Sequence, residues 1–164
     1  MLMRRFPVFF ALLFCLVAQN APAAVVRSAP DFTFPGVGNK SRSSRSLRGQ
    51  AVVLIIADSQ RQRAFKKQLR YLREIYQQFA SKQVVFIAAL RNDPATAVNS
   101  DIPFAVANNG PAVASAYGVN DDFQLIIIGR DGNIDYQTDR VATGERVRDV
   151  IQNSFVVQAA SRKR

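Results

Sequence analysis

The stretch VVLIIADSQRQRAFKKQL, residues 52–69, decides the fold class. It begins within a continuous apolar run, Ala51 to Ala57, whose length and β-branched residues are typical of a strand covered on both faces. After a polar turn, apolar residues recur at steps of three and four and predict a helix from about Gln60 to Ala80, with a core stripe formed by Phe65, Leu69, Leu72, Tyr76 and Phe79. A second apolar run, Val84 to Leu90, follows the helix, so the order predicts a βαβ unit with parallel strands.

Shorter elements flank this unit. Residues 24–50 predict a short strand at Asp31–Phe34 and then a solvated loop rich in Ser and Arg. Asp93-Pro94 predicts a helical turn, residues 102–107 a short extended piece, and Gly110-Pro111 a short helix that Gly118 ends.

The last third predicts a hairpin and a helix. Residues 123–138 read as two strands around the turn dipeptide Asp131-Gly132, with Ile134 and Tyr136 on one face. A helix from about Thr143 to Gln158 follows, with a core stripe of Val147, Val150, Ile151 and Phe155. We therefore expect an α/β sandwich with a mixed sheet over residues 51–158, preceded by a strand and basic loop over 24–50 and followed by a basic tail over 159–164.

The N-terminus has the pattern of a secretory signal peptide. Arg4 and Arg5 precede the apolar run VFFALLFCLVA, which is too short to span a bilayer, and APA at residues 21–23 offers small residues for cleavage. We expect residues 1–23 to be removed after Ala23 and the protein to be exported to a bacterial periplasm. An uncleaved membrane anchor is the alternative.

Cleavage at this site removes Cys15, which is the only cysteine, and both methionines. The mature chain then has no Cys, His, Met or Trp. Because the thiolate is the reacting species in disulfide and peroxide chemistry, neither reaction is available to it. Zinc and most transition-metal sites lose their usual ligands, so we expect no metal and no cofactor.

Four phrases, in order, resemble the redoxin branch of the thioredoxin-like superfamily, which includes peroxiredoxins and exported thiol-disulfide oxidoreductases. They are APDFTFPG (29–36), SLRGQAVVLIIA (46–57), AYGV (116–119) and IIIGRDGNIDY (126–136). The resemblance implies a thioredoxin-like three-layer α/β/α sandwich with a central mixed sheet. It also places the family's redox cysteines at the turn that begins the long helix.

This sequence departs from the family at the residues that carry the reaction. By alignment, Arg61 and Ala64 occupy the two cysteine positions. The family's cis-proline falls at Phe123, where no proline stands. A fold can be retained when the residues of its active site are replaced. We therefore expect the fold to be kept and the redox activity to be absent, whatever a redoxin family label implies.

The basic residues are the strongest indication of a function in this sequence. The formal net charge is +10, and +8 once Arg4 and Arg5 are removed. The segment from Lys40 to Arg73 is rich in Lys and Arg, and those in the predicted helix fall on one of its faces. The candidate docking residues are Arg61, Arg63, Lys66, Lys67, Arg70 and Arg73. Free N–H groups near Gln60 and Arg61 would add to an anion site. An idle solvated face is the alternative.

We expect the partner to be an anionic lipid or polysaccharide surface, or an acidic protein. Nucleic acid is not expected, because no aromatic residues are interleaved with the basic ones and the chain is exported. The oligomeric state is left open.

The alternative of an enzyme without thiols depends on carboxylates in the former redox cleft. Asp58, Asp121 and Asp122, with Arg61, could perform acid/base chemistry, or the carboxylates could hold a hard cation through their oxygens. Against this, Asp121 and Asp122 read as turn residues and Asp58 as a helix cap, or one of the three could pair with Arg61 or Arg63. A nucleophilic pair of Ser59 and Lys66 is disfavoured by their separation along the helix.

Overall fold

The computed structural model describes residues 27–36, 38, 40–79, 83–93 and 97–161, with the backbone alone for 156–161. The predicted signal peptide, the start of the mature chain, the turn at Pro94 and the last residues of the basic tail lie outside the described residues.

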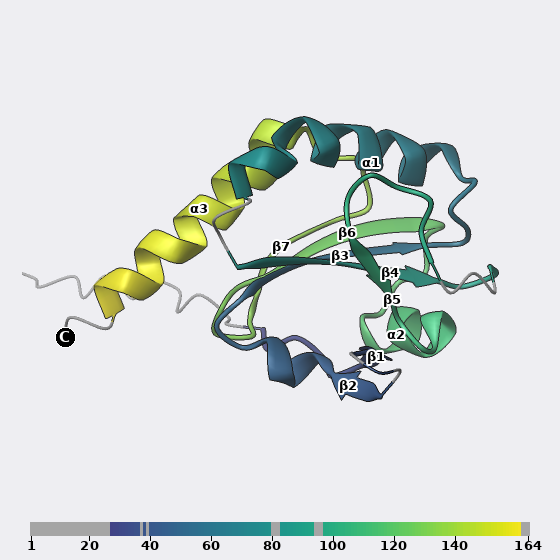
Figure 1. Ribbon diagram of the computed structural model, residues 1–164, viewed down its shortest axis with the longest axis horizontal. Coiled ribbons are helices and arrows are strands. Elements are labelled where there is room, and N and C mark those ends of the chain that lie inside the picture. The colour runs from purple at the N-terminus through teal and green to yellow at the C-terminus, as the bar shows by residue number, and fades with distance from the viewer. Residues whose placement is uncertain (1–26, 37, 39, 80–82, 94–96, 162–164) are drawn as a thin grey trace, which may run out of the picture.

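A mixed five-stranded sheet forms the centre of the fold (Figure 1), as predicted. Its spatial order is β5 (Phe104–Val106), β4 (Val84–Leu90), β3 (Ala51–Ala57), β6 (Phe123–Ile128) and β7 (Ile134–Thr138). The predicted βαβ unit is present, because β3 and β4 pair in parallel from Ala51 opposite Val84 to Ala57 opposite Leu90. β6 pairs antiparallel with both β3 and β7, which places the predicted hairpin at one edge.

Helices and short strands cover the two faces of the sheet. One face carries α1 (Arg63–Tyr76) and α3 (Gly144–Ser161), and a short 3-10 helix, η3 (Gln77–Phe79), continues α1. The opposite face carries β1 (Thr33–Pro35), β2 (Ser41–Ser43), the 3-10 helix η2 (Ser44–Leu47) and α2 (Gly110–Ala116) (Figure 1). The chain is therefore a three-layer α/β/α sandwich.

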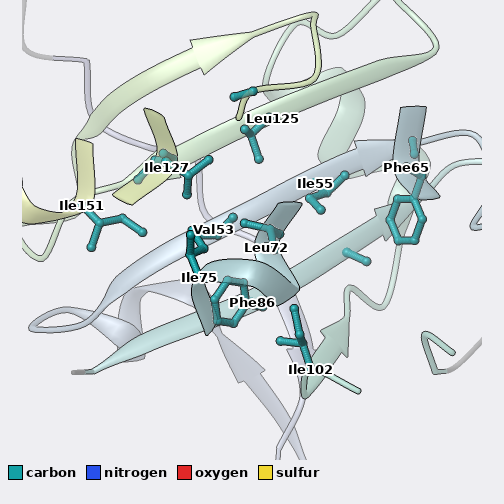
Figure 2. Close-up of a cluster of buried hydrophobic side chains, with 14 of the residues drawn as sticks. Val53, Ile55, Phe65, Leu72, Ile75, Phe86, Ile102, Leu125, Ile127 and Ile151 are labelled. Carbon is teal, nitrogen blue, oxygen red and sulfur yellow. The ribbon is translucent and has the colours of Figure 1, made fainter. Parts of the chain in front are cut away.

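Two apolar cores lie on either side of β3, whose residues are all buried. Val53 and Ile55 point toward the layer of α1 and α3, where they meet Phe65, Leu72 and Ile151 (Figure 2). Val52, Leu54 and Ile56 point the other way, toward η2 and α2. This arrangement follows from the period of two along a strand, and burying each such aliphatic side chain contributes roughly 1.5–3 kcal/mol.

A buried side-chain amide in α1 binds the backbone of the segment that leads into α3. The Gln68 side chain donates from Nε2 to the Ala142 carbonyl (3.1 Å) and accepts from the Ala142 N–H at Oε1 (2.9 Å). Gln68 is fully buried, so both of its hydrogen bonds replace contacts with water. The helical stripe predicted for α1 is thus interrupted by a polar residue that the sequence pattern had placed outside the core.

The structure corrects several predicted boundaries. The loop expected at residues 40–50 contains β2, which pairs antiparallel with β1, and η2. Ile134 and Tyr136 do not share a face: a register shift between Ile127 and Ile128 sends Ile134 to one core and Tyr136 to the other. The helix α3 runs to Ser161, so residues 159–161 are helical and not tail.

Among the described residues, the helices are all too short or too polar to cross a membrane.

Candidate functional site

The turn between β3 and α1 occupies the place where the resemblance locates a redox site. The helix begins at Arg63 and not at Gln60, because residues 59–62 form a turn in which the N–H groups of residues 60–62 are already bonded. Ser59 Oγ accepts from Arg61 N–H (3.0 Å), and Asp93 Oδ2 accepts from Gln60 N–H (3.3 Å). The prediction of free N–H groups at Gln60 and Arg61 is therefore wrong, since both groups donate hydrogen bonds within the protein.

Arg91, at the end of β4, binds the first carboxylate of this site. Its Nε donates to Asp58 Oδ1 (2.7 Å) and its Nη2 approaches both Asp58 Oδ1 and, at 3.6 Å, Asp122 Oδ1. Asn92 Nδ2 adds a further hydrogen bond to Asp58 Oδ1 (3.3 Å). Asp58 thus neither caps α1 nor pairs with Arg61 or Arg63, because the adjacent parallel strand supplies a nearer cation.

The former proline loop lies beside the turn, as expected. Asp58 N–H donates to the Asp122 carbonyl (3.2 Å), and Phe123 is paired with Ala57 across β6 and β3. Asp121 and Asp122 form the bend before β6 and both are exposed, with 80% of the Asp122 side chain open to solvent. Among the described residues the loop contains no cis peptide bond.

The two residues that the resemblance aligns with the family's cysteines, Arg61 and Ala64, lie at the start of α1. Arg61 is exposed in the turn and Ala64 is half-buried in the first helical turn. Phe65 and Phe123 are buried in the core below them. A hollow of about 350 Å³ remains above, lined by Gln60, Arg61, Phe65, Lys66, Leu69 and Asn99. Two of the predicted docking cations therefore flank a partly apolar depression.

We call the six predicted docking residues, Arg61, Arg63, Lys66, Lys67, Arg70 and Arg73, the α1 basic surface. Every one of them is exposed. Arg73 approaches Asp101 (3.4 Å), and Lys67 lies over the Tyr71 ring, 5.8 Å from its centre. Both of these contacts are at the surface, where they are weak and leave the cations accessible.

The basic residues that are continuous in sequence separate in space. Lys40, Arg42, Arg45 and Arg48 follow β1 and lie on or beside β2 and η2, on the sheet face opposite α1 (Figure 1). All four are exposed. Leu47 of η2 packs into one core and Phe65 of α1 into the other, which holds the two groups apart. The protein thus presents two basic surfaces, and we call this second one the β2–η2 basic surface.

A family comparison decides the relationship of the chain. Residues 25–137 match the AhpC/TSA family. The chain belongs to this family. The match includes β1 to β6 and nearly all of β7, and stops short of α3.

Solved structures of similar fold are thiol-disulfide and peroxide enzymes by name. The thiol:disulfide interchange protein DsbE from Chlorobium tepidum is 17% identical, with 79% of this chain and 96% of that chain covered and a TM-score of 0.64. Peroxidoxin BcpB from Mycobacterium tuberculosis is 14% identical, with 80% and 96% covered and a TM-score of 0.59. The lipoprotein thioredoxin Etrx1 from Streptococcus pneumoniae is 14% identical, with 76% and 99% covered and a TM-score of 0.55. The fold is therefore thioredoxin-like, as predicted.

No curated protein matches the sequence. None of the residues that the structure describes is a cysteine. No group of three or more Asp, Glu, His or Cys side chains in the same described part could hold a metal ion.

The other residues weighed as nucleophiles or ligands have structural partners. The Ser59 hydroxyl accepts from the backbone of its own turn, and Lys66 is exposed on α1. Tyr117 is buried and donates its hydroxyl to the Pro30 carbonyl (3.0 Å). Burial raises the pKa of Tyr117, the charge of Asp31 raises it further, and it stays protonated. Tyr71, Tyr76 and Tyr136 are half-buried, as predicted.

Sequence reasoning missed Arg91 and Asp93, which organise the vacated site. Both lie within three residues of the end of the buried strand at Leu90, and in parallel sheets the carboxyl ends of neighbouring strands meet at one edge. That rule, applied to β3 and β4, would have placed Arg91 beside Asp58.

Proposed function

We propose that this chain is a redox-inactive, exported member of the AhpC/TSA family that binds an anionic partner through the α1 basic surface. The observation that carries the proposal is a cationic solvent face on α1 in a chain whose described residues include no cysteine. The resemblance aligns Arg61 and Ala64, at the start of this helix, with the family's thiols.

The geometry of the surface suits a partner with several negative charges. At 100° per residue, the five cations from Arg63 to Arg73 fall within about 120° of the helix circumference and extend about 15 Å along its axis. The buried stripe of Phe65, Leu72 and Ile75 occupies the opposite side. A single small anion would contact only part of such an array, whereas a lipid headgroup layer, a polysaccharide or an acidic protein would contact all of it.

Export is supported by the predicted signal peptide over residues 1–23. One protein of similar fold, Etrx1, is described as an exposed lipoprotein. An exported location brings the chain close to anionic lipids and polysaccharides and away from nucleic acid.

A carboxylate enzyme is the weaker alternative. Asp58 is held by Arg91 and Asn92, and Asp121 and Asp122 face solvent, so the three groups do not converge on an enclosed reaction volume.

The test uses charge reversal with a matched control on the other side of the sheet. The mature chain is incubated with phosphatidylglycerol vesicles, an acidic polysaccharide and immobilised exported-fraction extract, at low and raised salt. The variant Lys67→Glu/Arg70→Glu is compared with Lys40→Glu/Arg42→Glu, which changes the net charge equally on the β2–η2 basic surface.

We expect salt-sensitive retention of the wild type that the α1 variant loses and the β2–η2 variant keeps. Retention by one of the three matrices would identify the class of partner. Equal loss in both variants would show that net charge alone drives binding and would refute a specific α1 surface. Asp122→Asn should bind like the wild type, and its failure to do so would favour the carboxylate cleft.

A further inference from the structure

A pocket lies on the other side of the molecule, between η2, the N-terminal segment and the turn that joins β6 to β7. Its volume is about 280 Å³, just below the usual range of about 300–1,000 Å³ for ligand-binding pockets, which limits it to small ligands. Leu47, Val52 and Ile128 form its apolar floor, and each belongs to the core shared by η2, α2 and the sheet. Ser28, Ser44, Arg45, Arg48 and Gln50 supply the polar rim.

The walls of this pocket are fixed by backbone hydrogen bonds. Ala29 N–H donates to the Gly132 carbonyl (3.0 Å), Gly49 N–H to the Arg130 carbonyl (2.7 Å) and Gln50 N–H to the Leu47 carbonyl (2.9 Å). Three segments distant in sequence are therefore joined around one cavity. A pocket formed in this way loses little conformational entropy when a ligand enters.

Arg48 is the charged group best placed to hold a ligand. Its side chain extends over Gly132, with Nε 3.3 Å from the position that a Cβ would take there. Among the described residues, the Arg48 side chain forms neither a hydrogen bond nor an ion pair, although its backbone N–H donates to the Arg45 carbonyl (3.2 Å). Arg45, on the same rim, approaches Asp31 at 3.6 Å and has 75% of its side chain exposed.

We propose that this pocket binds a small amphipathic anion, with its carboxylate or other acidic head at Arg48 and its apolar body on Leu47, Val52 and Ile128. The head would complete the charge-assisted hydrogen bonds that the guanidinium group lacks, and the body would cover the apolar floor. The site is separate from the α1 basic surface, because the sheet lies between them.

The experiment titrates the mature chain with 1-naphthoate and with its neutral counterpart, 1-naphthamide, while following amide shifts by ¹⁵N–¹H NMR. We expect saturable shifts centred on residues 47–50 and 129–132, and about tenfold tighter binding of the acid, the difference made by one charge-assisted contact.

Three variants test the placement. Arg48→Ala should weaken 1-naphthoate about tenfold. Ser28→Phe, which fills the cavity while keeping both arginines, should abolish binding. Lys67→Ala/Arg70→Ala should leave it unchanged, and amide dispersion shows whether each variant is folded. Equal affinity for the acid and the amide, or undiminished binding to folded Ser28→Phe, would overturn the proposal.

Discussion

Arg91 Nε donates to Asp58 Oδ1 over 2.7 Å, and this pair joins the ends of two parallel strands, β3 and β4, beside the turn that precedes α1. Only 20% of the Arg91 side chain and 32% of the Asp58 side chain are exposed. In solvent exposure, the pair is therefore intermediate between a buried and a surface ion pair. It holds the Asp58 carboxylate in a structural contact.

Arg91→Ala should lower the free energy of unfolding by about 1–2 kcal/mol, because it leaves the Asp58 carboxylate partly desolvated without its cation. Urea unfolding at pH 7 measures the loss. Arg148→Ala is the control, since Arg148 pairs at 3.3 Å with its own neighbour, Asp149, and should change stability by no more than about 0.5 kcal/mol. Equal losses in the two variants would contradict a structural role for Arg91.

Gln68→Leu should cost about 2 kcal/mol of stability, because it strands the N–H and the carbonyl of Ala142 in a buried place. The same urea titration detects it. Gln78→Leu, at an exposed position of η3, provides the control and should stay within about 0.5 kcal/mol of the wild type. A neutral Gln68→Leu would mean that water or a rearrangement satisfies the two backbone groups.

Cysteines placed at the vacated positions should form a disulfide. In Arg61→Cys/Ala64→Cys the two thiols occupy the positions that the resemblance aligns with the family's redox pair, so air oxidation should join them. A thiol titration should then detect neither thiol, and the mass should fall by about two hydrogens. The pair Arg63→Cys/Arg70→Cys lies about 10.5 Å apart along α1, beyond disulfide reach, and should keep its thiols. Persistent thiols in the first variant would place the redox position elsewhere.

Asp135 should make stability fall as pH rises. Burial raises the pKa of Asp135, the Ser154 hydroxyl offsets part of this, and the Asp131 charge raises it again. A raised pKa favours the protonated form in the fold, so its contribution is complete below the unfolded pKa of about 3.9 and is lost as pH rises through the folded value. Asp135→Asn should therefore be more stable than the wild type at pH 7, with the gain shrinking toward pH 3.

Asp31→Asn should behave in the opposite way. Burial raises the pKa of Asp31, but hydrogen bonds from Ser43, Ser44 and the Arg45 N–H, with the Arg45 charge, outweigh it and lower the pKa. This contribution is present above the unfolded pKa and is lost as pH falls through the folded value. Urea unfolding at pH 7, 5 and 3 should show a loss for Asp31→Asn that shrinks toward pH 3. The same sign for both variants would contradict these assignments.

The elements with a strong local pattern were predictable. The buried runs at Ala51–Ala57 and Val84–Leu90 became paired central strands, and the stripe from Phe65 to Phe79 became the helix between them. Where the local pattern was weak, the prediction was wrong. The Ser/Arg-rich segment, expected to be a loop, forms β2 and η2 because β1 and Asp31 provide partners outside the segment. The bulge that separates Ile134 from Tyr136 also depends on the neighbouring strand.

By itself, the sequence determined the order of the main strands and helices from residue 51 onward, the resemblance to the family and the lack of cysteine after Cys15. These follow from residue identity and local periodicity, which are properties of the chain alone. Only the tertiary structure decided which charges meet. It paired Asp58 with Arg91, and it placed η2, which Arg48 follows, and α1, which contains Lys67, on opposite faces of one sheet. The spacing of residues along the chain does not indicate on which face of the sheet a segment packs. The basic region that is continuous in the sequence is therefore two separate surfaces in the structure.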